Sequence, residues 1–235
     1  MGWSAGSTPE KIVPMHNAPT VAIIDYGLGN LFSVKHACEH VGLQAVITAV
    51  PDDIRAAKAV ILPGVGAFGD AMAALRERAL VDTLHAVEAG GTPLIGICLG
   101  MQLLMSESYE FGHHAGLNFI EGSVVRFEAP RLGDRILKVP QIGWNRICKV
   151  PGGTADPWAD SILHGIADGE YMYFVHSFYV KPADPAVVLS TTRYGHIDFC
   201  SSVQQRNITA WQFHPERSGE GGLHLYRQLA LSLRP

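Results

Sequence analysis

The sequence carries few charges and has no long apolar run. Charged residues make up 17% of the 235 positions, and 18 Lys and Arg against 22 Asp and Glu give a formal net charge of −4. This acidic balance argues against a dedicated nucleic-acid binder. No apolar run approaches the roughly 18 residues that cross a bilayer, so we expect no membrane span. The hydrophobic fraction of 47% excludes global disorder.

Cysteine is also scarce. The four cysteines are Cys38, Cys98, Cys148 and Cys200. They form no C-x-x-C pair, which excludes a zinc ribbon and a dithiol redox motif, and we expect neither a metal nor a cofactor. The start of the chain lacks the apolar stretch of about 7–15 residues that marks a secretory signal. We therefore expect a reducing, cytoplasmic location, in which at most one thiol has a chemical role.

The remaining pattern predicts one α/β domain. Residues 1 to 20 are rich in small residues and proline and show no period, so we expect a flexible tail before a domain over residues 21 to 235. Continuously apolar segments alternate with helical patterns up to about residue 117, which is typical of a parallel sheet covered on both faces. Aromatic and alternating segments follow, which indicate antiparallel or mixed strands. The expected fold is a mixed, mostly parallel central sheet flanked by helices.

Specific elements follow from the same pattern. Strands are predicted over residues 20–25, 43–50, 58–64, 92–97, 123–127, 171–180, 187–194 and 208–214. Helices are predicted over residues 31–42, 51–57, 74–91, 99–108 and 221–233. Gly42 is the expected C-terminal cap of the first helix.

A glycine loop follows the third predicted strand. Gly64, Gly66 and Gly69 match G-x-G-x-x-G, a pattern that can cradle the pyrophosphate of a dinucleotide at a helix N-terminus. The acidic residue that this fingerprint requires about 20 positions later falls near Asp82, inside a predicted helix rather than at a strand end. The glycines therefore fit a plain turn at least as well.

The segment Gly96-Ile97-Cys98-Leu99-Gly100 is a candidate nucleophile elbow. A sharp strand-to-helix turn strains the backbone of the nucleophile, so small residues are required two positions before and after it. The turn exposes the sulfur, and the helix N-terminus favours a thiolate. The amide of Leu99 points to the place where an oxyanion would form. The alternative is a structural cysteine in a tight turn.

A base and its orienting carboxylate are available near the end of the chain. The last predicted strand leads into His214-Pro215-Glu216. If that strand runs parallel to the strand of Cys98, His214 reaches the thiol from the same sheet edge. In an extended chain Glu216 would lie on the same side as His214 and support its imidazole.

The segments GICLGMQLL and QFHPE together resemble the class I (triad) glutamine amidotransferases. The resemblance covers essentially residues 21 to 235 and implies a flavodoxin-like fold. It implies that Cys98 attacks the carboxamide of glutamine, that His214 is base and acid, and that Glu216 orients His214. It also gives the glycine loop a third interpretation, in which the amide of Val65, flanked by Gly64 and Gly66, joins that of Leu99 in an oxyanion hole.

The same resemblance implies a set of substrate-binding residues. Gln102 lies one helical turn beyond the cysteine and resembles the glutamine-binding Gln of the family. Glu110 stands where the family has an acid that receives the substrate's ammonium group. The sequence HSF, His176, Ser177 and Phe178, matches an element whose backbone holds the substrate's carboxylate.

Four longer stretches narrow the resemblance. IIDYGLGNLFSVKHA, PGVGAFGDAM, VPQIGWN and YMYFVHSFYV resemble, in this order, the glutaminase subunits of imidazole glycerol phosphate synthases. That resemblance implies a separate (β/α)8-barrel cyclase partner, which uses the ammonia in histidine biosynthesis. Asn30, Trp144 and Asn145 are the expected partner-facing residues, although core packing is equally consistent for Trp144. Gln141 departs from the pattern, which usually has His there.

Two other functions remain open from the sequence. One is a stand-alone γ-glutamyl thiol hydrolase on the same fold. The other is a nucleotide-binding module that uses the loop of Gly64, Gly66 and Gly69.

Overall fold

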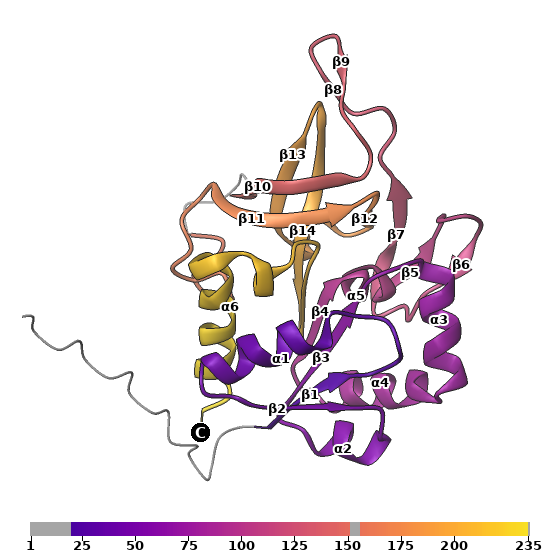
Figure 1. Cartoon of the computed structure of the whole chain (residues 1–235), viewed down its shortest axis with the longest axis vertical. Helices are drawn as coiled ribbons and strands as arrows, with labels where there is room; N and C mark the ends of the chain where they lie inside the picture. The colour runs from indigo at the N-terminus through magenta and orange to yellow at the C-terminus, as the bar shows by residue number, and fades with distance from the viewer. Residues whose placement is uncertain (1–19, 151–155, 235) are drawn as a thin grey trace, which may run out of the picture.

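The computed structural model describes residues 20–150 and 156–234, and it is built around one large mixed sheet (Figure 1). The order of its main path is β2-β1-β3-β4-β15-β14-β12-β7-β5-β6. Off this path, β13 pairs with β14, β10 with β13, and β11 with β10. The predicted tail of residues 1 to 20 lies outside the described residues, apart from Thr20, which begins β1.

The strands from β2 to β15 in that order are all parallel, and so is the pair β5–β7. The other pairings are antiparallel. The strands of the large sheet are β1 (Thr20–Ile24), β2 (Gln44–Thr48), β3 (Ala59–Gly64), β4 (Leu94–Cys98), β5 (Met105–Ser108), β6 (His114–Ala115), β7 (Ile120–Arg126), β10 (Gln141–Lys149), β11 (Glu170–His176), β12 (Phe178–Pro182), β13 (Val188–Tyr194), β14 (Ile197–Gln205) and β15 (Ile208–Trp211). A separate hairpin, β8 (Arg131–Leu132) and β9 (Arg135–Ile136), projects at the top of Figure 1.

Helices cover both faces of the parallel part. They are α1 (Leu31–His40), α2 (Pro51–Ala56), α3 (Phe68–Glu77), α4 (Leu80–Ala89), α5 (Leu99–Leu103) and α6 (Gly219–Ser232), with 3₁₀ turns η1 (Pro185–Val187) and η2 (Pro215–Arg217). In Figure 1, α1 and α6 lie on one side of the strands and α3 and α4 on the other. None of the helices among the described residues is long and apolar enough to span a bilayer.

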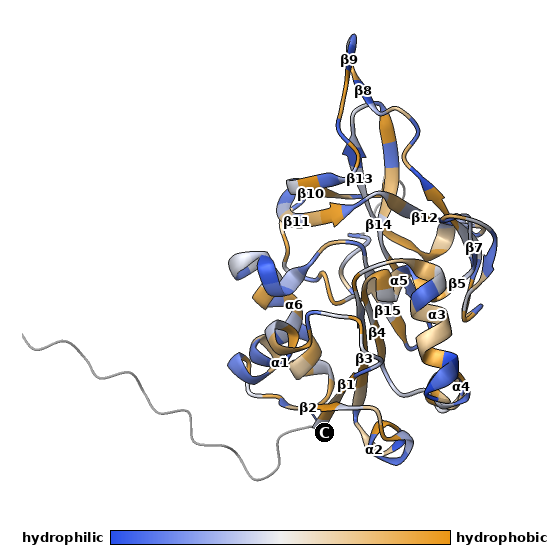
Figure 2. Ribbon diagram, turned by 45° about the vertical axis from the view of Figure 1, so that its right-hand side comes forward, coloured by the Kyte–Doolittle hydropathy of each residue, from blue (hydrophilic) through white to orange (hydrophobic). Residues whose placement is uncertain are grey.

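Alternation along β1 shows why these strands are apolar throughout. Val21 and Ile23 pack into the core under α1 and α6, whereas Ala22 and Ile24 pack into the core under α3 and α4. Since successive side chains point to opposite faces, a strand between two helical layers must be apolar at every position. Figure 2 shows the resulting hydrophobic centre of the sheet. The expected α/β fold with a mixed sheet and flanking helices is confirmed.

Local sequence signals predicted two helix boundaries correctly. The end of α1 is a Schellman motif, in which Gly42 has φ +86°, its N–H donates to the Glu39 carbonyl, and the Leu43 N–H donates to the Cys38 carbonyl. Pro51 begins α2, as expected.

Two predicted helices were wrong in extent. The helix predicted over 74–91 is two helices, because Ala79 adopts a left-handed conformation with φ +54° between α3 and α4. The helix predicted over 99–108 ends at Leu103, and Met105–Ser108 form β5 instead. β5 lies parallel to β7, so a partner far along the chain overrides the local helical pattern.

Candidate active site

Cys98 lies at the junction between β4 and α5, in a strained backbone conformation with φ 56° and ψ −110°. The glycines around it are sterically required. A Cβ at Gly96 would lie 2.9 Å from both the Ala210 Cβ and the Leu104 Cδ1. A Cβ at Gly100 would collide with the carbonyl oxygen of Leu62. The G-x-C-x-G segment therefore forms the nucleophile elbow that its spacing predicts.

His214 reaches this elbow because β15 lies parallel to β4, with Trp211 opposite Ile97. The His214 Nδ1 lies 2.8 Å from the Glu216 Oε1, and both side chains are buried. The expected extended geometry was wrong, however. Pro215 opens the 3₁₀ turn η2, and it is this turn that brings the Glu216 carboxylate back to the imidazole.

Electrostatics couple the three side chains. Burial by itself would lower the pKa of His214, but the neighbouring Cys98 and the Glu216 carboxylate outweigh it and raise that pKa to about 10. The His214 Nε2 is buried and forms no hydrogen bond to the residues that the structure describes. The ring therefore has one nitrogen fixed by Glu216 and a second available for proton exchange at the sulfur.

The sulfur itself contacts two groups that the sequence did not indicate. Gln212 donates from its Nε2 to the Cys98 Sγ at 3.6 Å, and the Sγ lies 3.9 Å from the Val175 carbonyl oxygen. Gln212 was missed although its position was informative. It lies two residues before His214 and directly after β15, which ends at Trp211.

These groups border a cavity of about 340 Å³, a volume suited to an amino acid. Its lining comprises Val65, Gly66, Cys98, Leu99, Gln102, Glu110, Pro140, Val175, His176, Ser177, Phe178 and His214. The structure thus brings together nearly all the predicted oxyanion and substrate residues. Gly64 lies just outside, opposite Cys98 in the β3–β4 register. A larger hollow of about 480 Å³ lies near the start of β4, and none of its lining residues is a cysteine.

The predicted oxyanion loop follows β3 at the mouth of this cavity. Tyr26 donates its hydroxyl to the Pro63 carbonyl at 2.7 Å, which fixes the end of the strand. A side chain at Gly64 would collide with that hydroxyl. Gly66 has φ +107°, a conformation that glycine adopts without strain. The loop is therefore fixed at its base, with a flexible residue directly after Val65.

Glu110 has a buried position that bears on the glycine loop. Its Oε2 accepts a hydrogen bond of 2.6 Å from the Phe68 N–H at the start of α3. Burial raises its pKa, against the effect of that hydrogen bond. A carboxylate at this helix N-terminus occupies the place where a pyrophosphate would bind. Asp82 lies inside α4 and not at a strand end, so the geometry disfavours a dinucleotide site.

Gln102 and His176 fix the other wall. The Gln102 Nε2 donates to the Phe178 carbonyl at 3.1 Å and to the Gln212 Oε1 at 2.9 Å. The His176 Nδ1 lies 2.8 Å from the same Phe178 carbonyl. Burial lowers the pKa of His176 to about 4, so the imidazole is neutral at physiological pH. Neither side chain therefore brings a charge into the cavity.

Ser218 is a second residue that the sequence did not single out. Its hydroxyl donates to the His214 carbonyl at 2.6 Å and accepts from the Tyr173 N–H at 2.9 Å. It thereby ties η2 to β11. A serine just before the terminal helix could have been expected to act as a cap, but its partners are set by the tertiary fold.

The expected partner-facing residues separate into different environments. Trp144 is 56% exposed on β10, which excludes ordinary core packing. Its neighbour Asn145 necessarily points to the other side of the strand, where its Nδ2 donates to the Arg193 carbonyl at 2.9 Å. Asn30 lies at the N-terminus of α1 without a capping hydrogen bond from its side chain. Asn145 thus has an intramolecular role, and Trp144 faces solvent.

Comparisons with known proteins agree with this geometry. The family described as Glutamine amidotransferase class-I matches residues 22–231. Imidazole glycerol phosphate synthase subunit HisH of Geobacter metallireducens is 47% identical over 216 residues, covering 91% of this chain and 98% of that protein. The subunit of the same name from Rhodopirellula baltica is 45% identical over 210 residues, covering 89% and 96%.

Solved structures show the same fold at low sequence identity. The structure of PurLQS from Thermotoga maritima has a TM-score of 0.70 at 18% identity, covering 93% of this chain and 100% of that chain. The glutaminase domain of CTPS from Trypanosoma brucei, with bound acivicin, has a TM-score of 0.61 at 16% identity, covering 93% and 95%. With the family match over nearly the whole described chain, these findings show that the chain belongs to the class I glutamine amidotransferases.

Proposed function

We propose that this chain is the glutaminase subunit of an imidazole glycerol phosphate synthase. It hydrolyses glutamine and delivers the ammonia to a separate (β/α)8-barrel cyclase subunit in the cytoplasm, for histidine biosynthesis. The observation that carries the chemistry is that Cys98, at positive φ, and His214 line one cavity, while Glu216 bonds to His214 from behind. The names of the relatives support the pathway, and four free thiols support a reducing location.

The reaction follows from the positions of these groups. The Cys98 sulfur attacks the carboxamide carbon of glutamine, and the amides of Val65 and Leu99 hold the resulting oxyanion. The His214 imidazolium gives its Nε2 proton to the departing ammonia, which leaves a glutamyl thioester on Cys98. The neutral imidazole then takes a proton from water, whose oxygen attacks the thioester. Glutamate leaves as the Cys98 sulfur is released beside the His214 imidazolium, which restores the starting state.

The lining residues account for specificity toward a free amino acid. The Glu110 carboxylate receives the substrate's ammonium group, and the backbone around Ser177 and Phe178 receives its carboxylate. Gln102 lines the wall between them and positions the Phe178 carbonyl. We also retain a single catalytic domain over residues 21 to 235, which the family match over residues 22–231 supports.

A glutaminase assay of the full chain tests this function. We expect little glutamate formation from glutamine by the chain alone, and a large increase with the barrel subunit and its nucleotide ligand, because the proposed function couples hydrolysis to the partner that uses the ammonia. Substantial turnover of γ-glutamyl peptides without any partner would instead favour a stand-alone thiol hydrolase. Absence of glutamine hydrolysis in every combination would refute the proposal.

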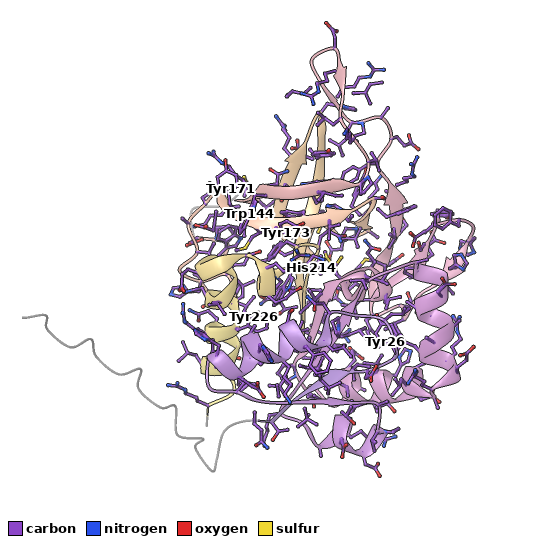
Figure 3. All side chains as sticks on the ribbon, viewed as in Figure 1. Tyr26, Trp144, Tyr171, Tyr173, His214 and Tyr226 are labelled. Carbon is purple, nitrogen blue, oxygen red and sulfur yellow. The ribbon has the colours of Figure 1, made fainter. Side chains whose placement is uncertain are left out.

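We assign the partner contact to the outer surface of β10 and β11, named the aromatic face and formed by Ile142, Trp144, Tyr171 and Tyr173. Figure 3 shows its three aromatic residues together on these strands. Trp144 packs edge-on against Tyr173, with ring centroids 6.1 Å apart. Exposed aromatic residues of this kind dominate binding energy at protein interfaces. Asn30 belongs to the same proposed surface because it follows β1 at the carboxyl edge of the sheet.

Replacing Trp144 with alanine is expected to weaken partner binding about 30-fold, the effect of an interface residue worth about 2 kcal/mol. The measurement is a titration of the barrel subunit by calorimetry. Leu231→Ala is the matched control, because Leu231 is 50% exposed on α6, away from the aromatic face. If the two variants bound the barrel subunit with equal affinity, the partner contact would lie outside the aromatic face.

A further inference from the structure

One of the two carboxylate oxygens of Glu216 has no hydrogen-bond partner within the described part of the chain. Its Oε1 is taken by the His214 Nδ1 at 2.8 Å. Its Oε2 is buried and has no hydrogen-bond partner among residues 20–150 and 156–234, and the side chain is only 1% exposed. A carboxylate oxygen withdrawn from water is costly unless a donor satisfies it. The site therefore requires a donor beside Glu216 that the triad itself does not contain.

Tyr226 on α6 carries a buried hydroxyl donor. Its side chain is 2% exposed, and its hydroxyl is buried without a partner in the described part of the chain. Burial raises its pKa far above the usual value, and the nearby Glu216 carboxylate and the Cys38 thiol raise it further. The charge of Glu216 therefore acts directly on this hydroxyl. Figure 3 labels Tyr226 on α6, below His214 in this view.

The contact between η2, which carries Glu216, and the start of α6 keeps Tyr226 and Glu216 in the same region. A Cβ at Gly222 would collide with the Pro215 carbonyl oxygen, so the first turn of α6 packs directly against η2. Tyr226 lies four residues after Gly222 and hence on the same helix face. The Ser218 hydroxyl, bonded to the His214 carbonyl, fixes the start of this helix.

We propose that Tyr226 is a positioning residue of the glutaminase, whose hydroxyl donates a hydrogen bond to the Glu216 Oε2, either directly or through one water. The terminal torsion of a glutamate has a broad minimum, so one hydrogen bond to His214 leaves the carboxylate able to rotate. A second donor fixes its plane and, through it, the imidazole. The inference rests on the proposed function, because it assigns a role in that reaction.

Trp211 is the competing donor. Its indole N–H is also buried without a partner in the described residues, and it packs in the same core as Tyr226. The two side chains reach this core from different elements, β15 and α6. Separate Trp211→Phe and Tyr226→Phe variants therefore distinguish them.

The kinetic test is Tyr226→Phe in the complex with the barrel subunit. We expect kcat for glutamine hydrolysis to fall about 10-fold, in line with loss of a hydrogen bond to a charged group. KM should change less than about twofold, because Tyr226 does not line the cavity. Tyr194→Phe is the matched control, since it removes a hydroxyl bonded to the Lys138 carbonyl, and it should leave both constants unchanged.

A second readout does not depend on catalysis. If the hydroxyl bonds to Glu216, Tyr226→Phe should lower the urea midpoint of the full chain, and lower it less in a Glu216→Gln background. Removal of an unpaired buried hydroxyl would leave the midpoint unchanged or raise it. An active wild type with an unchanged kcat and midpoint in Tyr226→Phe would overturn this inference alone. The inference would also be overturned if the fall in kcat and the fall in the urea midpoint appeared in Trp211→Phe and not in Tyr226→Phe. An inactive wild-type complex would refute the proposed function.

Discussion

Replacing Cys98 with alanine is expected to lower glutaminase kcat in the complex by about 10⁴-fold or more, the cost of removing the nucleophile of a catalytic triad. Without the sulfur no thioester can form, and the remaining groups can only bind glutamine. The measurement is glutamate formation by the complex at saturating glutamine. Retention of more than a small fraction of wild-type activity would show that another group carries the reaction.

The fold should survive this substitution. Alanine keeps the Cβ of Cys98 and removes only the sulfur, whose contacts are Gln212 Nε2 and the Val175 carbonyl. The complex should therefore still assemble, and external ammonium should support the cyclase reaction at the wild-type rate. That result would separate loss of chemistry from loss of the partner contact.

Cys38→Ala is the matched control for Cys98→Ala, because it makes the same change at a buried thiol in α1. Burial raises the pKa of Cys38 to about 12, so this thiol is protonated at physiological pH. We expect kcat to stay at the wild-type value and only stability to change. A comparable loss of activity in Cys38→Ala would mean that the effect of either substitution is structural.

The elbow around Cys98 could be predicted from the sequence because the residues it requires fall within five consecutive positions. The glycines avoid collisions with Ala210 and Leu62, which belong to neighbouring strands. This requirement nevertheless appears in the chain as a fixed spacing of Gly96 and Gly100 around Cys98. The apolar strand before the elbow could also be predicted, since a strand covered on both faces must be apolar at every position.

The misjudged elements depend on distant partners. Ala79 carries no glycine or proline signal, yet the chain turns there to pack α3 and α4 separately on the sheet. Met105–Ser108 becomes a strand only because Ile120–Arg126 lies beside it. Glu216 does contact His214, as expected, but through a different geometry, since the 3₁₀ turn at Pro215 replaces an extended chain. The sequence indicated which residues lie together at the site more reliably than the local structure that brings them there.

The supporting groups of the triad were the least predictable. Gln212 bonds to a cysteine 114 positions away, and Ser218 bonds to a strand 45 positions away. No periodicity connects such residues, because their partners are set by strand order. The same applies to Tyr226, whose helical spacing marks it only as a core residue of α6.

Replacing His214 with asparagine is expected to lower kcat by about 10³-fold or more at neutral pH. Asparagine preserves a buried polar side chain but can neither hold a positive charge beside Cys98 nor exchange its proton. The high pKa of His214, about 10, keeps the imidazolium next to the sulfur across the physiological range. In the proposed reaction, both the protonation of the leaving ammonia and the activation of water depend on this ring.

The distinguishing measurements for His214→Asn are KM and the reactivity of Cys98 toward iodoacetamide. KM for glutamine should change little, because the proposed function assigns the charged ends of the substrate to Glu110 and the Ser177–Phe178 backbone, not to His214. Alkylation of Cys98 at pH 7 should slow markedly, because the cation beside the sulfur is gone. His85→Asn, an exposed histidine on α4, should alter neither quantity. A normal alkylation rate in His214→Asn would assign the activation of Cys98 to its backbone and to Gln212, and His214 would then act only in proton transfer to ammonia and from water.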